Sequence, residues 1–235
     1  MKRYTTYIFD FDYTLVDSSR GIVTCFRHVL GNHGHTGVTD TEIKRTIGKT
    51  LEESFSILTG ITEAGTLADY KREYVKAADV HMTANTFFFP ETIEVLEALK
   101  SRGTVLFLET KSVLAALKDS GARIGIISTK FRYRILDLFE KTGHDGLVDF
   151  IVGGEDVTAA KPDPEGLLLA IGRASGGGKS EVLYVGDSVV DAATAQAAGT
   201  DFAGVLHGMT TREELEAYPH VAIVDDLRGI LPVPV

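Results

Sequence analysis

The sequence predicts an α/β protein in which a parallel sheet with crossover helices is interrupted, after its first strand, by an all-helical segment. Short apolar runs alternate with helical patterns through the second half of the chain. One further apolar run lies near the N-terminus, and only helical spacing separates it from the others. The 235 residues, at roughly 150 per domain, leave room for one such domain and a smaller one.

The elements follow in order along the chain. The first strand is predicted at 7–9, directly before an acidic turn. Apolar residues at helical spacing come next, in three groups: Ile22, Cys25, Phe26, Val29, Leu30; Leu51, Phe55, Leu58; and Leu67, Tyr70, Tyr74. The other predicted strands are 123–128, 147–152, 182–185, 202–206 and 220–224. We therefore expect an α/β core domain of residues 1–16 and 89–235 and a helical domain of residues 17–88.

Composition and charge exclude several classes of protein. Lys and Arg number 24 against 33 Asp and Glu, so the net charge is −9, and the chain has no basic run that would bind nucleic acid. A single cysteine, Cys25, excludes an intramolecular disulfide and a cysteine-rich zinc site. The first residues lack the continuous apolar stretch that is typical of a signal peptide, and no apolar run is long enough to span a membrane. We expect a soluble, cytoplasmic protein; the sequence does not define its oligomeric state.

The middle of the chain contains a repeat. Residues 91–103 and 109–121 are identical at eight of thirteen positions, at an offset of 18, which favours a tandem duplication over coincidence. Gly103 is a natural helix stop and 104–108 is strand-like in composition, so helix, extended segment and helix is favoured over one long helix. We expect one copy to pack as the crossover helix and the other to lie at the surface.

Two aspartates follow the first predicted strand. Asp10 and Asp12 are two residues apart, so in an extended chain their carboxylates point the same way. Their repulsion favours a hard cation such as Mg²⁺ between them, and a carboxylate can also attack phosphorus. A solvated turn with helix-capping acids is an equally good interpretation of this motif alone.

A second acidic pair follows the strand 182–185. Asp187 and Asp191 lie four residues apart at the start of a predicted helix, on one face of it. Gly186 would let the backbone approach a ligand closely. Simple N-capping would account for Asp187, but it would not account for Asp191.

Two further strand ends carry polar residues. Lys161 stands in a Lys-Pro-Asp-Pro loop and could serve as a point charge for a phosphoryl group. Ser128 ends the predicted strand 123–128, and Thr129 follows it. The Lys161 loop could instead be an ordinary proline-rich lead-in to a helix, and Ser128 could simply cap the helix that follows. Residues 108–111 resemble 127–130, but we favour Ser128 because the next helical pattern follows it directly.

These four motifs occur in order, each after a predicted strand, where open parallel sheets bind ligands. In this combination the chain resembles the haloacid dehalogenase superfamily, and within it the phosphoglycolate phosphatase-like members with a type 1 helical cap. The resemblance implies a Rossmann-like parallel sheet core with an all-helical cap inserted after the first strand. It covers nearly the whole chain. One departure is Tyr13, where the family most often has glycine.

The resemblance also implies roles for the residues of the motifs. Asp10 would be the nucleophile, and Asp12 would protonate the leaving alcohol and then activate water. Ser128, Thr129 and Lys161 would hold the phosphoryl group.

It likewise implies a metal site. Asp10, the backbone carbonyl of Asp12 and Asp187 would hold Mg²⁺, with Asp191 supporting it directly or through water.

We therefore expect a Mg²⁺-dependent phosphatase acting on a small phosphorylated metabolite through a phospho-aspartate. A sugar phosphomutase or an inorganic pyrophosphatase is the alternative on the same scaffold, and an inactive, partner-binding protein altered by the duplication is an alternative of another class. Lys44, Arg45 and Lys49 could meet a substrate carboxylate or second phosphate, although a solvated helix face is the simpler interpretation.

Overall fold

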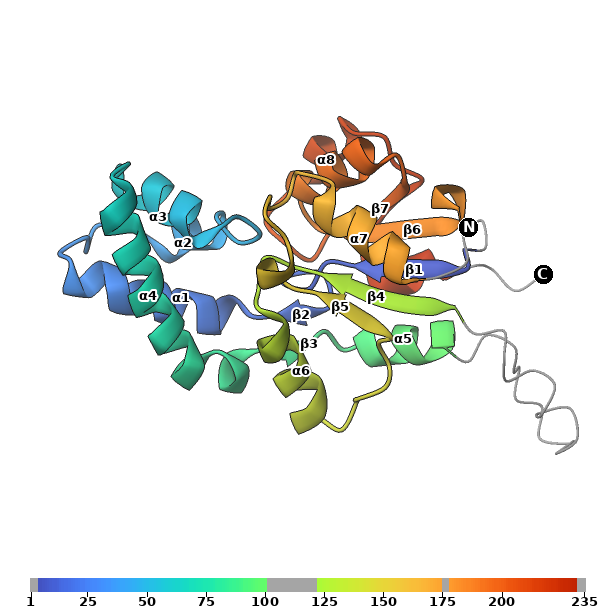
Figure 1. Ribbon diagram of the computed structural model, residues 1–235, viewed down its shortest axis with the longest axis horizontal. Coiled ribbons are helices and arrows are strands. Elements are labelled where there is room, and N and C mark those ends of the chain that lie inside the picture. The colour runs from blue at the N-terminus through green and yellow to red at the C-terminus, as the bar shows by residue number, and fades with distance from the viewer. Residues whose placement is uncertain (1–3, 101–121, 175–177, 232–235) are drawn as a thin grey trace, which may run out of the picture.

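A six-stranded parallel sheet forms the centre of the molecule in the computed structural model, which describes residues 4–100, 122–174 and 178–231 (Figure 1). The strand order is β5-β4-β1-β6-β7-β8, and every neighbouring pair is parallel. The strands are β1 (Thr6–Phe9), β4 (Arg123–Ile127), β5 (Phe150–Val152), β6 (Val182–Gly186), β7 (Asp201–Val205) and β8 (Ala222–Val224). The predicted fold class is confirmed, because each of these strands falls within or beside a predicted apolar run.

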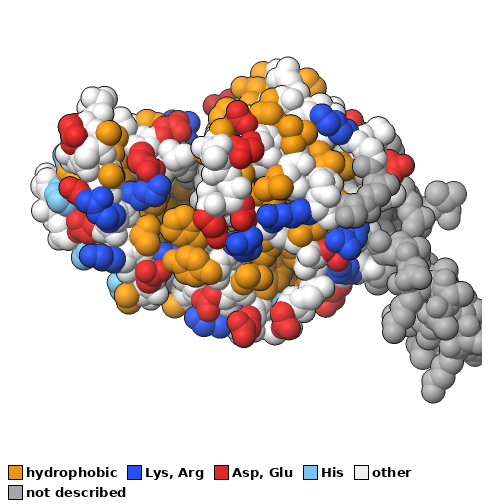
Figure 2. Space-filling view, in the orientation of Figure 1, with side chains coloured by type: hydrophobic (Ala, Val, Ile, Leu, Met, Phe, Trp, Pro, Cys, Tyr) orange, Lys and Arg blue, Asp and Glu red, His pale blue; other side chains and the backbone are white. Residues whose placement is uncertain are grey.

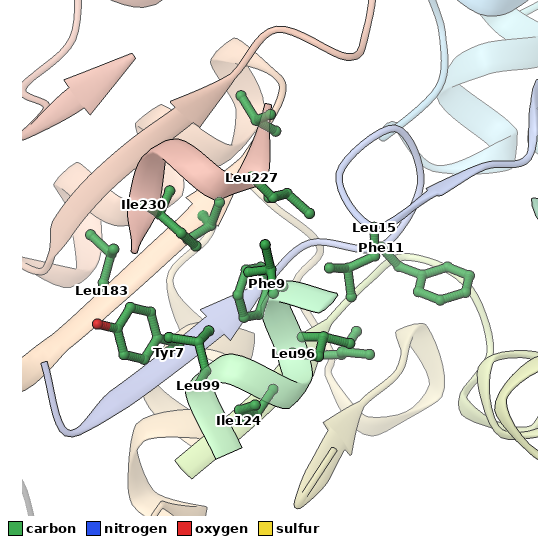
Figure 3. Packing of buried hydrophobic residues seen from close by; sticks show 14 of the residues in the cluster. Tyr7, Phe9, Phe11, Leu15, Leu96, Leu99, Ile124, Leu183, Leu227 and Ile230 are labelled. Carbon is green, nitrogen blue, oxygen red and sulfur yellow. The ribbon is translucent and has the colours of Figure 1, made fainter. Parts of the chain in front are cut away.

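Helices cover both faces of the sheet (Figure 1). Successive strand residues alternate between the faces, so Tyr7 and Phe9 pack on one side and Ile8 on the other. Figure 3 shows the first of these layers, in which Leu96 and Leu99 pack against the strands. That layer contains α5 (Thr92–Lys100), α6 (Arg132–Lys141) and the 3₁₀ turn η4 (Leu227–Ile230). The opposite layer contains α7 (Glu165–Arg173), α8 (Val189–Ala198) and α9 (Arg212–Glu216).

The helical segment projects from the sheet as a separate layer, which we call the cap (Figure 1). It contains α1 (Ser19–Asn32), α2 (Asp40–Lys44), α3 (Leu51–Thr59), α4 (Ala64–His81) and the 3₁₀ turn η1 (Thr83–Asn85). Its buried residues form a hydrophobic cluster of their own, around Phe26, Phe55 and Tyr74. Local sequence defines its elements: Thr50 accepts a hydrogen bond from the Glu53 amide at the start of α3.

A two-stranded antiparallel ribbon connects the cap to the sheet domain. It pairs β2 (Val16–Asp17) with β3 (Phe87–Phe88). The sequence predicts no strand here, because a two-residue strand is too short to show an alternation of apolar and polar residues. We propose this ribbon as the boundary between the core domain, 1–16 and 89–235, and the cap, 17–88.

Polar contacts hold the cap against α6. The Arg134 guanidinium lies 2.8 Å from a carboxylate oxygen of Asp79 in α4 and donates to the Val75 carbonyl at 3.1 Å. The Tyr133 hydroxyl donates to the same carboxylate at 2.7 Å. These contacts close one side of the space between the cap and the core domain.

The first copy of the repeat supplies α5, and its Leu96 and Leu99 are fully buried. The second copy and the extended segment predicted between them lie outside the described residues. The chain resumes at Ala122, whose amide donates to the Leu99 carbonyl at 3.1 Å. This contact brings together the two points at which the chain leaves and rejoins the described fold.

The remaining short elements are η2 (Gly154–Asp156) and η3 (Lys179–Glu181). In the described residues no helix is long and apolar enough to cross a membrane.

Candidate active site

The site lies at the carboxyl edge of the sheet, where three adjacent strands end. Asp10 follows β1, Ser128 follows β4 and Asp187 follows β6. All three side chains are buried, with between 3% and 8% of each residue exposed. The parallel order of these strands therefore brings together residues that are far apart in the sequence.

Lys161 lies between two of the carboxylates. Its ammonium is 2.8 Å from Asp10 Oδ1 and 2.6 Å from Asp191 Oδ1. Asp191 also accepts hydrogen bonds from the hydroxyls of Tyr184, at 2.7 Å, and Ser188, at 2.5 Å. Both oxygens of Asp191 are thus engaged, one by Lys161 and Tyr184 and the other by Ser188. This arrangement makes Asp191 the residue that orients Lys161.

Asp10, Asp187 and Asp191 form a buried cluster that could hold a metal ion. One carboxylate oxygen from each lies within 4.8 Å of the other two. Thr14 donates a hydrogen bond to Asp187 Oδ1 at 3.2 Å. A Cβ at Gly208 would overlap the Asp187 carboxylate, so glycine leaves the space that this side chain occupies. The oxygen donors and their burial fit a hard divalent cation.

The pKa shifts show that the cluster holds excess negative charge. Burial, together with the neighbouring Asp191, raises the pKa of Asp10 to about 7 despite the opposing charge of Lys161. Burial and the same carboxylates raise the pKa of Asp187 well above its usual value. Burial alone would lower the pKa of Lys161, but Asp10 and Asp191 outweigh it and raise that pKa. A divalent cation would relieve the repulsion between Asp10 and Asp187.

Asp12 has a different environment, facing the cap. It accepts a hydrogen bond from the Ser18 hydroxyl, and its Oδ1 lies 3.1 Å from the ammonium of Lys130. The Asp12 and Lys130 side chains are 9% and 8% exposed, so this ion pair is largely excluded from water. Tyr13, next in the chain, adopts a left-handed φ of 61°, the conformation that favours glycine at this position.

A cavity of about 190 Å³ lies between the cap and the strand ends. Five residues at its floor carry polar groups: Asp12, Ser128, Thr129, Lys130 and Lys161. The predicted phosphoryl-holding residues therefore share one cavity with Asp12, and Lys161 connects that cavity to the carboxylate cluster.

Lys44 and Arg45 lie elsewhere, beside a smaller cleft of about 90 Å³ that is also lined by Asp187 and Ser188. Lys49 lines both spaces and forms an ion pair with Glu53 at 2.8 Å.

Two residues of the site, Lys130 and Tyr184, are not among those that the sequence motifs predict. Lys130 follows Ser128 by two residues, and its place after a strand-ending hydroxyl is the pattern that could have identified it. Tyr184 lies inside β6, where a tyrosine in an otherwise aliphatic strand suggests a hydroxyl with a buried partner.

Comparison with known proteins agrees with this geometry. Residues 4–199 match the family model described as a hydrolase, haloacid dehalogenase-like hydrolase. The chain is 28% identical to pyrophosphatase PpaX of Bacillus velezensis, over 99% of this chain and 97% of that protein. It is 30% identical to PpaX of Bacillus pumilus, over 89% of this chain and 87% of that one.

Solved structures share the whole fold. A crystal structure of a haloacid dehalogenase-like hydrolase from Bacteroides fragilis superposes with a TM-score of 0.86 and 56% identity, covering 97% of this chain and 100% of that one. A structure from Lactobacillus plantarum described as a phosphoglycolate phosphatase has a TM-score of 0.79 at 23% identity, covering 97% and 98%. The strand-end aspartates, the lysine between them and these matches together show that the chain belongs to the haloacid dehalogenase-like hydrolases, among the phosphatases of that family.

Proposed function

We propose that the protein is a Mg²⁺-dependent phosphatase that hydrolyses a small phosphomonoester through a phospho-aspartate at Asp10. The observation that carries this proposal is the contact between Asp10 and Lys161, which is 2.8 Å long and buried at the edge of a cap-covered cavity. Lys161 is near enough to hold a phosphoryl oxygen against the nucleophile, where it stabilises charge that develops in the transition state.

The reaction divides into two steps on this chain's own residues. Asp10 attacks phosphorus and the bond to the leaving oxygen breaks, while Asp12 donates a proton to that oxygen. Asp12 then takes a proton from water, whose oxygen attacks the phospho-aspartate and releases phosphate. Lys130 and Ser18 hold the Asp12 carboxylate in place for both transfers. Ser128 lies on the cavity floor, where its hydroxyl can bind a phosphoryl oxygen.

The carboxylate cluster fits the metal that this reaction needs. Asp10 and Asp187 would hold Mg²⁺, with the backbone carbonyl of Asp12 beside them and Asp191 acting through Lys161 or water. When bound, Mg²⁺ would act as a Lewis acid and neutralise the charge of the phosphate next to the buried carboxylates.

Inorganic pyrophosphatase is a second candidate, because relatives 28% and 30% identical to this chain are named pyrophosphatase. The same residues could perform either reaction, with phosphate in place of an alcohol as the leaving group. The two candidates differ in the leaving group that the cavity on the cap side must accept, which is an alcohol for a phosphatase and a phosphate for a pyrophosphatase.

The proposal is tested by phosphate release from p-nitrophenyl phosphate with and without Mg²⁺. We expect Mg²⁺-dependent turnover that Asp10→Asn abolishes. Asp225→Asn is the matched control, because the Asp225 side chain is 89% exposed and pairs with Arg212 at the surface. Turnover that survives Asp10→Asn, or that needs no divalent cation, would refute the proposed mechanism.

A further inference from the structure

The wall of the cavity is apolar above its polar floor. Cap side chains make up most of this wall, and Figure 2 shows hydrophobic side chains gathered where the cap meets the core domain. The apolar residues that the cap contributes include Ile22, Phe26, Ile47, Leu51, Val75 and Met82, and the core domain adds Ile127, Phe131, Val152 and Val157. A leaving group bound here would therefore exchange water for contact with hydrocarbon.

Every cation that lines this cavity already has a carboxylate partner among the described residues. Two of them belong to the cap: Lys49 pairs with Glu53 at 2.8 Å, and Lys71 pairs with Glu52 at 2.7 Å. The other three are Lys130 with Asp12, Arg134 with Asp79, and Lys161 with Asp10 and Asp191. A second phosphate or a carboxylate on the substrate would have to compete with these carboxylates for a cation. The cost of that competition is greatest at Lys130, Arg134 and Lys161, whose side chains are 7–8% exposed. The Lys49 and Lys71 pairs are 31–47% exposed, so their carboxylates hold these cations less firmly.

The Tyr74 hydroxyl is a polar group of the wall that is available to a ligand. Tyr74 lines the cavity and is 6% exposed, and its hydroxyl makes no hydrogen bond to any other residue in the described part of the chain. Its ring is fixed against Phe26, with the ring centroids 4.9 Å apart. Burial, followed by the nearby Cys25 and Asp12, raises the pKa of this phenol well above its usual value, so it remains a neutral donor.

The position of Asp12 defines which space the leaving group occupies. The proposed general acid must contact the leaving oxygen, and Asp12 lines the large cavity. The smaller cleft, with Lys44 and Arg45, is lined instead by Asp187 and Ser188, on the side of the carboxylate cluster. Lys44 and Arg45 are therefore poorly placed to receive a leaving group that Asp12 protonates.

From this distribution we propose that the substrate is a phosphomonoester of an uncharged alcohol with an apolar face, whose hydrogen-bonding group meets the Tyr74 hydroxyl. This rests on the proposed function and deepens it. An enzyme with this preference differs from those whose leaving group is a phosphate or carries a carboxylate. Those are the leaving groups that the names of the relatives indicate.

The test compares substrates that differ in the leaving group. With Mg²⁺ present, kcat/KM is measured for 2-phenylethyl phosphate, 2-phosphoglycolate and inorganic pyrophosphate. We expect 2-phenylethyl phosphate to exceed each of the other two by about tenfold or more. Pyrophosphate has the better chemical leaving group, so this preference would have to come from binding in the cavity.

Two matched variants on α3 locate the preference. Leu51→Lys places a cation in the wall and should lower the ratio of kcat/KM for phenylethyl phosphate to that for pyrophosphate by about tenfold. Ile57→Lys makes the same change on the same helix at a residue that is 57% exposed and outside the cavity, and should leave the ratio unchanged. Tyr74→Phe keeps the ring and should raise KM for substrates that offer the Tyr74 hydroxyl an acceptor.

The outcomes separate this inference from the proposed function. Equal or better use of pyrophosphate or phosphoglycolate would overturn the inference while leaving a phosphatase. If Arg45→Met then removed that activity, the smaller cleft would be the anion site. Absence of Mg²⁺-dependent turnover with every substrate, in a protein that is folded by circular dichroism, would instead refute the proposed function.

Discussion

Replacing Lys161 by methionine should destabilise the metal-free protein while removing its activity. The ammonium lies 2.8 Å from Asp10 and 2.6 Å from Asp191, and the Lys161 side chain is 7% exposed. Removing one partner of such a buried pair costs about 3–5 kcal/mol, since the remaining charge stays buried. For a chain of this size each kcal/mol lowers Tm by about 2–4 °C, so we expect a fall of about 10 °C.

The fall in Tm that Lys161→Met causes should depend on pH. Because the pKa of Asp10 is raised to about 7, above its unfolded value, Asp10 binds more protons in the folded state than in the unfolded state between these values. Its contribution to stability is therefore present at low pH and is lost as the pH rises through about 7. Without Lys161 this pKa rises further, so the difference in Tm between Lys161→Met and the wild type should be larger near pH 8 than near pH 5.5.

Differential scanning calorimetry in EDTA, at these two pH values, measures the effect. Lys141→Met is the matched control, because Lys141 pairs with Asp137 at the same distance of 2.8 Å but its side chain is 63% exposed. A surface pair of this kind contributes at most about 1 kcal/mol. A Tm for Lys161→Met within the range of the control, or a difference that shrinks as the pH rises, would refute the reasoning about the buried cluster. Added Mg²⁺ should recover part of the Tm but not the turnover, since the proposed mechanism also needs Lys161 to hold the phosphoryl group.

Three further outcomes are expected. Deletion of 104–121 should leave Tm close to that of the wild type and kcat/KM within about twofold of it, because the Ala122 amide already contacts the Leu99 carbonyl at 3.1 Å and the deletion rejoins the chain after a glycine; loss of folded protein would contradict this. The Mg²⁺-induced rise in Tm should be larger near pH 8 than near pH 5.5, because protons compete with the metal for Asp10, and a larger rise at low pH would count against a carboxylate site. Arg134→Met should raise KM by about tenfold with a smaller effect on kcat, because it removes two of the contacts that hold the cap against α6, and steady-state kinetics with an unchanged KM would contradict that role.

The repeat illustrates where sequence reasoning reached its limit. Both copies have the same helical pattern, so the sequence predicted that one would form the crossover helix but not which one. The structure uses the first, with Leu96 and Leu99 packed under β1 and β4. The helical pattern is the same in both copies, so the choice of the first depends on its contacts with the sheet, which the sequence of either copy does not specify.

By itself the sequence determined the α/β order of elements and the motifs around Asp10, Ser128, Lys161 and Asp187. It could do so because strand periodicity, turn residues and charged groups at strand ends are local properties of the chain. The tertiary structure alone decided which charges meet. It placed Lys161 between Asp10 and Asp191, and it packed apolar side chains of the cap around the cavity that Asp12 lines. These arrangements depend on distances between distant segments and on the exclusion of water, and both arise only when the sheet and the cap pack together.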